Sequence, residues 1–287
     1  MESVLEAPAD TSIQAADKGQ LELAQPGSGP HSRAEHVAAG RAVRLRVPRT
    51  SHAEWNASAK KRDPIAILEA SNQGRLQELV PIRFGRMLRS PFTFLRGSAA
   101  LMAHDLATGP NSGFQVQACG DCHLMNFGLF ATPERNLVFD LNDFDETLPA
   151  PWEWDVKRLA VSFAVAARER GLADAQAEAI SMTCVRSYRE HLRDYSTMSP
   201  LEVWYARLDM ASVIAMAPDE KSKKIRRQLE ANARKRVIEN LFPKITDATA
   251  GGHRLVDQPP ILYHVAEPDV EERIREGLED YRLSLSD

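Results

Sequence analysis

The stretch Cys119-Gly-Asp-Cys-His-Leu-Met-Asn-Phe-Gly128 contains residue types that build catalytic and metal-binding sites, namely Cys, Asp, His and Asn. It follows an alternating run, Phe114–Cys119, that is bounded by glycines, and this pattern predicts a short strand. A second run, Asn136–Leu141, predicts another strand that leads into Asn142-Asp-Phe-Asp-Glu146. We therefore expect a strand, a loop and a second strand that bring two polar segments together.

The residue types in these two segments suit phosphoryl transfer from a nucleotide. Asp121 and Asn126 stand five residues apart in the expected loop, and the acidic run from 142 to 146 follows. Such chemistry needs one carboxylate to orient or deprotonate the acceptor hydroxyl. An amide oxygen and a second carboxylate hold Mg²⁺ against the phosphates.

The segments on either side of this centre are predicted to be helical. The helical pattern covers Pro64–Ala70, Leu76–Leu88 and Phe92–Ala107 before the centre, and Trp152–Gly171 and Ile180–Tyr195 after it. Pro149 and Pro151 are expected to end the central part. The predicted fold class is α+β, with a helical first part, a small strand-and-loop centre and a helical bundle.

Residues 1–45 are rich in Ala, Gln, Gly, Ser and Pro and have few large apolar side chains. A segment of this composition cannot bury enough surface to offset its ordering entropy, so we expect a disordered tail. Residues 46–287 are assigned to one domain.

Composition excludes several classes of protein. Apolar residues make up 43% and charged residues 26% of the 287 residues, and the net charge is −4. No apolar run is long enough for a membrane helix, and the N-terminus lacks a secretory pattern, so we expect a cytoplasmic protein without membrane partners. Three cysteines argue against a disulfide framework.

Cys119-Gly-Asp-Cys122-His123 matches the attachment pattern of a c-type haem. Haem ligation requires export, and a zinc site requires a second cysteine pair, for which Cys184 offers no partner. A redox dithiol would be expected to open a helix rather than enter a loop. We expect neither haem nor zinc, and two thiols packed near the loop.

Four acidic residues gather after the second strand: Asp140, Asp143, Asp145 and Glu146. They predict a metal site, a solvated turn or pairing with arginine, because like charges repel unless something compensates them. Arginines available for pairing are Arg83, Arg86, Arg96 and Arg158. Arg96 could contact either a carboxylate or a phosphate.

Residues 221–236 are rich in Lys and Arg. A basic helix can bind nucleic acid, but no aromatic residue is interleaved, and an apolar stripe through Ile225 and Leu229 remains. A solvated face of a core-packed helix is the favoured interpretation, so we expect no nucleic-acid partner.

Gly120-Asp121-x-His123-x-x-Asn126 resembles the catalytic loop of aminoglycoside and choline kinase-like enzymes. Asp143-Phe144 resembles their metal-binding Asp. By this resemblance Asp121 is the base, Asn126 and Asp143 are metal ligands, and ATP and Mg²⁺ are the expected cofactors.

The same resemblance makes Asp155 a support that braces the loop from a buried helix, and His123 a second support or an ordinary loop histidine. The gap from Asn126 to Asp143 is longer than in most such kinases, so Asp140 and Asp145 remain rival ligands.

A longer set of motifs resembles the bacterial family called domain of unknown function 2252, from about Val47 onward. These motifs are Ser90-Pro-Phe-Thr-Phe-Leu-Arg-Gly97, the loop itself, Leu137–Pro149 and Trp152-Glu-Trp-Asp-x-Lys-Arg-Leu-Ala160. The resemblance implies a protein-kinase-like C-lobe. It also implies a chain truncated at its C-terminal end, without the glycine-rich turn and strand lysine that clamp a nucleotide.

Two hypotheses follow. The first is an ATP- and Mg²⁺-dependent phosphotransferase, or a fragment of one, with an unknown acceptor. The second is a non-catalytic kinase-like protein that keeps the acidic loop for structure or metal and acts by binding a partner.

Overall fold

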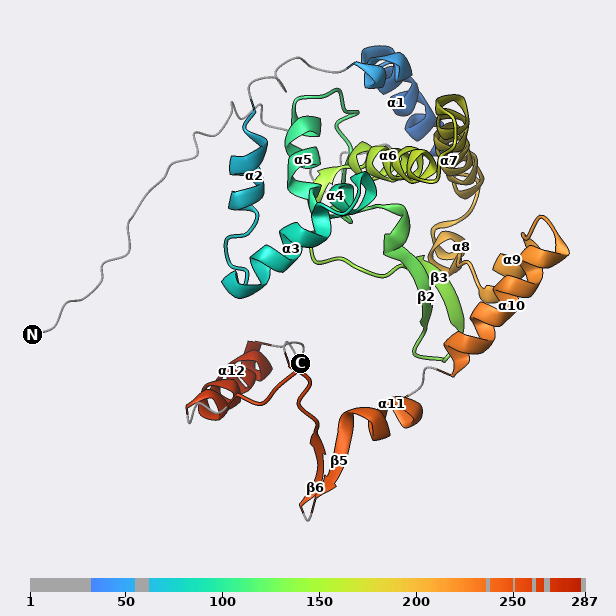
Figure 1. Cartoon of the computed structure of the whole chain (residues 1–287). Coiled ribbons are helices and arrows are strands. Elements are labelled where there is room, and N and C mark those ends of the chain that lie inside the picture. The colour runs from blue at the N-terminus through green and yellow to red at the C-terminus, as the bar shows by residue number, and fades with distance from the viewer. Residues whose placement is uncertain are drawn as a thin grey trace, which may run out of the picture. The chain divides into compact units, whose positions relative to one another are not determined.

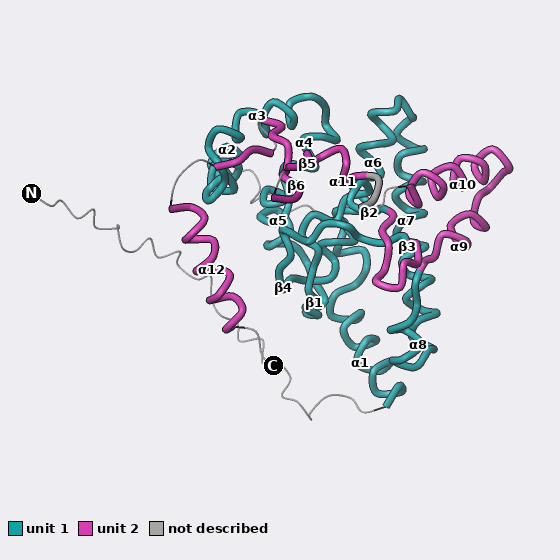
Figure 2. Tube along the Cα trace, turned by 90° about the horizontal axis from the view of Figure 1, so that it is seen from below, with its two compact units in different colours: residues 1–128, 139–207 teal, residues 129–138, 208–287 magenta. Residues whose placement is uncertain are grey.

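A computed structural model describes residues 32–54, 62–235, 238–249, 251–259, 262–265 and 269–284. The protein is mostly helical with small antiparallel sheets, which confirms the expected α+β class (Figure 1). The chain divides into two compact units, coloured separately in Figure 2. Unit 1 comprises residues 1–128 and 139–207, and unit 2 comprises residues 129–138 and 208–287.

Unit 1 holds the helices and strands that surround the polar loop. Its helical elements are α1 (Arg33–Arg46), η1 (Arg49–Ala53), α2 (Pro64–Ala70), η3 (Gln77–Leu79), α3 (Val80–Met87), α4 (Pro91–Gly97), α5 (Ala99–Ala107), η4 (Leu124–Asn126), α6 (Glu153–Glu169), α7 (Asp174–Tyr195) and α8 (Pro200–Tyr205). Its strands are β1 (Gln115–Ala118) and β4 (Leu148–Pro151). The boundary between the units runs through the hairpin of β2 (Phe127–Ala131) and β3 (Leu137–Leu141).

Unit 2 consists otherwise of α9 (Met210–Ala215), α10 (Glu220–Arg234), α11 (Ile238–Ile245), β5 (Thr246–Thr249), β6 (Gly252–Leu255) and α12 (Val270–Ser284). The Asp219 side chain caps α10 by accepting from the Ser222 backbone N–H at 2.7 Å. Ile225 and Leu229 of α10 are 53% and 52% exposed. The prediction that this helix packs an apolar face into a core is therefore wrong, since neither side chain is buried.

The second part of the predicted disordered tail is helical in the structure. Residues 1–31 lie outside the described residues, whereas residues 33–45 are helical in α1. Ser32 starts this helix because its side chain accepts from the Glu35 N–H while the Glu35 carboxylate accepts from the Ser32 N–H. This reciprocal capping satisfies two of the N–H groups that a helix start otherwise leaves unpaired.

The predicted strand at Phe114–Cys119 is present as β1, and it pairs with a strand that the sequence did not predict. β4 runs antiparallel to β1, with Gln115 opposite Pro151 and Gln117 opposite Pro149. Proline lacks the N–H that a ladder requires, but these two prolines are alternate residues at the outer edge of a two-stranded sheet. Their missing donors face away from β1, so they do not terminate the strand.

Helices α6 and α7 lie side by side and form the centre of unit 1 (Figure 1). The ring of Trp152, just before α6, stacks on Tyr188 of α7 with centroids 5.8 Å apart. Ser162 of α6 and Ala177 of α7 are completely buried. α4 and α5 also contact α6, so this helix is covered on several sides.

Within the described ranges, no helix combines the length and the apolar character that crossing a membrane requires.

Candidate functional site

The polar loop is held against the acidic turn by a glycine that no other residue could replace. Gly120 has a φ of +82°, and a Cβ built on it would lie 1.9 Å from the carbonyl oxygen of Glu146. A side chain at this position would meet both backbone strain and a steric clash with main chain. Gly120 thus lets the loop touch the segment that carries Asp143, Asp145 and Glu146.

The Asp155 side chain, on α6, holds the start of the loop through hydrogen bonds to the backbone of the loop. Its two carboxylate oxygens accept from the N–H groups of Cys119 at 2.7 Å and Gly120 at 3.2 Å. Burial raises the pKa of Asp155, although the two N–H donors and the nearby Arg158 oppose this shift. These are the contacts that the proposed supporting role requires.

Asp121 is paired with Arg158, one turn further along α6. The Arg158 Nε atom donates to Asp121 Oδ1 at 2.7 Å, and Arg158 also donates to the carbonyl of Leu95 at 2.7 Å. Burial alone would raise the pKa of Asp121, but the His123 hydrogen bond and the Arg158 charge outweigh it and lower the pKa. Asp121 is therefore held as a carboxylate.

Ser162 provides a third anchor, which sequence reasoning missed. Its hydroxyl accepts from the Leu124 N–H at 3.0 Å and donates to the Leu159 carbonyl at 2.7 Å. Asp155, Arg158 and Ser162 are spaced i, i+3 and i+7, which places them on one helix face. The i, i+3 and i+7 spacing of these polar residues was a sequence signal that could have added Arg158 and Ser162 to Asp155.

His123 lies inside the loop and is 4% exposed. Its Nδ1 atom accepts from the Met125 N–H at 3.2 Å, so the neutral ring carries its proton on Nε2. That proton points toward Asp121 Oδ2, 3.4 Å away. The Nε2 atom cannot then also accept from Arg96, whose Nε atom lies at 3.4 Å.

Asn126 joins the two polar segments through its side-chain amide. Its Nδ2 group donates at 3.1 Å to the backbone carbonyls of Asp121 and Asp143. Because both partners are acceptors, the orientation of the amide is fixed and Oδ1 points elsewhere. No hydrogen bond to Oδ1 occurs within the described ranges, so this oxygen is available as a ligand.

The structure brings Asp143 and Asp145 to this loop but not Asp140. The Asp143 carbonyl accepts from Asn126, and Asp143 Oδ1 accepts from the Asp145 N–H at 3.4 Å. Burial raises the pKa of Asp145, and the neighbouring Asp143 charge raises it further. All three carboxylates are exposed, but Asp140 bonds the adjacent Leu141 N–H within β3 rather than a residue of the loop.

Glu146 lies in the same cluster and has an arginine partner. Burial raises its pKa, and so do the charges of Asp121 and Asp145. Arg75 forms an ion pair with it at 3.8 Å.

Arg96, expected to contact either a phosphate or a carboxylate, is exposed beside His123. Among the described residues it forms no ion pair with a carboxylate. Arg83 donates instead to Asn72 and to the Gly97 carbonyl, at 3.0 and 2.6 Å.

Cys119 and Cys122 are free thiols and both are buried. The Cys119 thiol donates to the Asp143 carbonyl at 3.5 Å. A hydrogen bond with Cys122 lowers the pKa of Cys119, and the same bond together with burial raises the pKa of Cys122. Both side chains are part of the packing of the loop.

The donor set suits a magnesium ion better than a soft metal. No three His, Cys, Asp or Glu side chains of the described residues gather as a metal-holding group. Mg²⁺ typically uses one or two carboxylates and takes its remaining ligands from water and substrate phosphates. Asp143 and Asn126 Oδ1 offer a carboxylate and an amide oxygen of that kind.

The fold and the site together define an α+β protein with an acidic loop braced by one helix. Residues 75–287 match the family described as an uncharacterized protein conserved in bacteria (DUF2252), and the chain belongs to this family. The match begins at residue 75, where the motifs suggested a start near Val47. No curated protein and no solved structure matches the chain.

Proposed function

We propose that the loop Gly120–Asn126 and the turn after β3 form the catalytic half of a kinase-like phosphotransferase. The observation that carries the proposal is the Asn126 amide, which ties the backbones of Asp121 and Asp143 together with one side chain. This linkage keeps a prospective base and a prospective metal ligand at a fixed spacing.

In this proposal Asp121 orients the hydroxyl of the acceptor. Its lowered pKa makes it a weak proton acceptor in the ground state, so positioning is its main contribution. Asn126 and Asp143 would hold Mg²⁺, with Asp145 as the rival ligand. When bound, Mg²⁺ neutralises charge on the phosphates of ATP.

Arg96 is the candidate contact for a transferred phosphate. Its guanidinium is exposed beside His123, and it has no carboxylate partner among the described residues. A guanidinium in that state is free to donate two parallel hydrogen bonds to a phosphate.

The test is Mg²⁺-dependent transfer of the γ-phosphate of ATP, either to water or to small molecules of a bacterial extract, followed by ³¹P NMR. We expect Asp121→Asn to reduce the rate by about 10²- to 10⁴-fold. Asp143→Asn should weaken the Mg²⁺ dependence of the reaction. Asp140→Asn is the matched control and should leave the rate and its Mg²⁺ dependence unchanged. Equal effects of Asp143→Asn and Asp140→Asn, or no Mg²⁺-dependent binding of ATP, would overturn the proposal.

A second function, a non-catalytic binding protein with a structural acidic loop, is favoured by one observation. Asp121 is already engaged by Arg158, whose side chain is 2% exposed. This hypothesis expects Asp143→Asn to lower stability without changing the affinity for Mn²⁺, used as a spectroscopic substitute for Mg²⁺.

A further inference from the structure

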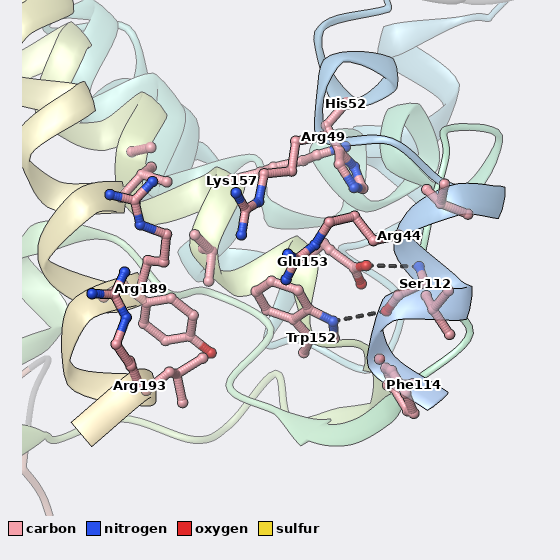
Figure 3. Close-up of a pocket in the computed structure, with 18 residues that line it drawn as sticks. Arg44, Arg49, His52, Ser112, Phe114, Trp152, Glu153, Lys157, Arg189 and Arg193 are labelled. Atoms are coloured by element: carbon pink, nitrogen blue, oxygen red, sulfur yellow. Dashed lines mark hydrogen bonds between the residues drawn. The ribbon is translucent and has the colours of Figure 1, made fainter. Parts of the chain in front are cut away.

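A cavity of about 770 Å³ lies in unit 1 on the side of α6 away from the polar loop (Figure 3). Its lining comes from α1, η1, the segment before β1, α6 and α7. The loop residues Asp121, Asn126 and Asp143 are not part of it. The cavity is therefore a second candidate site within unit 1.

Positive charge dominates the lining. Five cations border the cavity, and Glu153 is the single carboxylate among the lining residues; the cations are Arg44, Arg49, Lys157, Arg189 and Arg193. One oxygen of the Glu153 carboxylate accepts from the Ser112 N–H at 2.7 Å, and the other, Oε2, is buried without a hydrogen-bond partner among the described residues. Within the described ranges, none of the five cations forms an ion pair.

The cations stand on two sides of the cavity. Arg189 and Arg193 come from α7, Arg44 and Arg49 from the α1–η1 segment, and Lys157 from α6 between them (Figure 3). Burial lowers the pKa of Lys157, and the Glu153 charge only partly opposes this. The four arginines are exposed, and with Glu153 as the single carboxylate the lining carries a net positive charge, which attracts an anion.

Apart from His52 and Ser112, the rest of the lining is apolar and aromatic. Trp152 stacks on Tyr188, and its Nε1–H donates to the Ser112 hydroxyl at 2.8 Å, which fixes the indole plane. Aliphatic side chains complete the wall: Val43, Val47, Val156, Val185 and Leu192. An inorganic ion alone would leave this surface uncovered, whereas a larger organic body would bury it.

We propose that this cavity binds a small organic phosphate with more than one negative charge and an apolar or aromatic body. Guanidinium groups match phosphate oxygens with two parallel hydrogen bonds, and four of the five cations are arginines. The cavity volume is within the range of small-molecule sites. This site is separate from the proposed phosphotransfer loop and does not depend on it.

The test is isothermal titration calorimetry on the full chain in magnesium-free buffer with EDTA. The probes are adenosine monophosphate, dodecyl phosphate below its micelle concentration, and inorganic pyrophosphate. We expect adenosine monophosphate or dodecyl phosphate to bind with one-to-one stoichiometry and more tightly than pyrophosphate. Adenosine monophosphate would identify an aromatic body and dodecyl phosphate an aliphatic one.

Charge reversal locates the binding. The double variant Arg189→Glu, Arg193→Glu should weaken binding by about tenfold or more, because two charge-assisted contacts become repulsive. Arg186→Glu reverses one charge on α7 outside the cavity and should leave affinity unchanged, whereas Arg189→Glu or Arg193→Glu alone should not leave it unchanged. Asp143→Asn should also leave it unchanged, which separates this site from the loop.

Two results would overturn the proposal. One is the failure of both organic phosphates to bind more tightly than pyrophosphate. The other is an equal loss of affinity in Arg186→Glu and in the double variant, with thermal unfolding showing that all variants are folded.

Discussion

Burial distinguishes the Asp121–Arg158 ion pair from the surface pairs of the chain. The Arg158 side chain is 2% exposed and that of Asp121 18%, whereas Arg168 and Asp174 are 58% and 85% exposed. A buried guanidinium that loses its partner leaves uncompensated charge in a medium of low dielectric constant. An exposed guanidinium remains hydrated when its partner is removed.

We expect Asp121→Asn to lower the free energy of unfolding by about 2 to 4 kcal/mol, because Arg158 would stay buried without a counter-charge. The matched control is Asp174→Asn, which removes the exposed partner of Arg168 and should change stability by less than about 0.5 kcal/mol. Urea denaturation at neutral pH measures both. Similar values for the two variants would mean that the Asp121–Arg158 pair contributes no more to the free energy of unfolding than an exposed pair does.

The motif identifies Asp121, Asn126, Asp143 and Asp155; in the structure the first three lie in the loop and the acidic turn, and Asp155 contacts the loop from α6. The motif could not select Arg158 from the four available arginines. Asp121 and Arg158 are 37 positions apart, and only the packing of α6 against the loop decides which arginine arrives there. Asp140 and Asp145 could not be separated for the same reason, since the position at which β3 ends determines which carboxylate lies next to Asp143.

At the scale of elements, α6 is the scaffold of the loop. It contacts the backbone of the loop at Cys119, Gly120 and Leu124 through two side chains, Asp155 and Ser162. A buried N–H without an acceptor costs its full desolvation free energy, so each of these bonds holds the loop in one conformation.

Ser162→Ala should lower the free energy of unfolding by about 1 to 3 kcal/mol, because it leaves the Leu124 N–H buried without an acceptor. Ser181→Ala is the control, since the Ser181 hydroxyl only donates to the Ala160 carbonyl, at 2.8 Å, and its loss orphans no N–H group. Chemical denaturation of both variants provides the comparison. If Ser181→Ala costs as much as Ser162→Ala, the anchoring role of Ser162 is wrong.

Helices α2, α3, α6 and α7 were predictable because their apolar residues repeat at helical spacing, whereas the predicted stretch Phe92–Ala107 is divided at Ser98 into α4 and α5. β4 was not predictable, because Pro149 and Pro151 are signals that normally end a strand. The edge position that makes them acceptable depends on the pairing with β1, which is a tertiary contact. In α1, the local capping pair of Ser32 and Glu35 outweighed the composition of the surrounding tail.

At the scale of the whole molecule, the two units differ in how much apolar surface they bury. Among the described residues, the buried apolar side chains belong to unit 1 with two exceptions, Val138 and Met210. Helix α12 exposes Ile274, Leu278 and Tyr281 to 57%, 63% and 62%. A helix with little apolar burial gains little stability from packing.

Hydrogen–deuterium exchange with mass spectrometry should therefore separate these elements. We expect the amides of α12 to exchange at least about 100-fold faster than those of α6, because local opening of α12 exposes little new apolar surface. Peptides from α7 supply a protected reference within unit 1. Equal protection of α12 and α6 would show that unit 2 buries this helix in solution.

The two-sided use of α6 also limits how its sequence can change. Asp155, Arg158 and Ser162 serve the loop, while Glu153 and Lys157 border the cavity on the other side. A surface helix such as α10, which has no buried residue, tolerates new side chains around most of its circumference. Val161 of α6, 39% exposed, belongs to neither set, so we expect a substitution there to be tolerated better than one at a residue that faces the loop or the cavity.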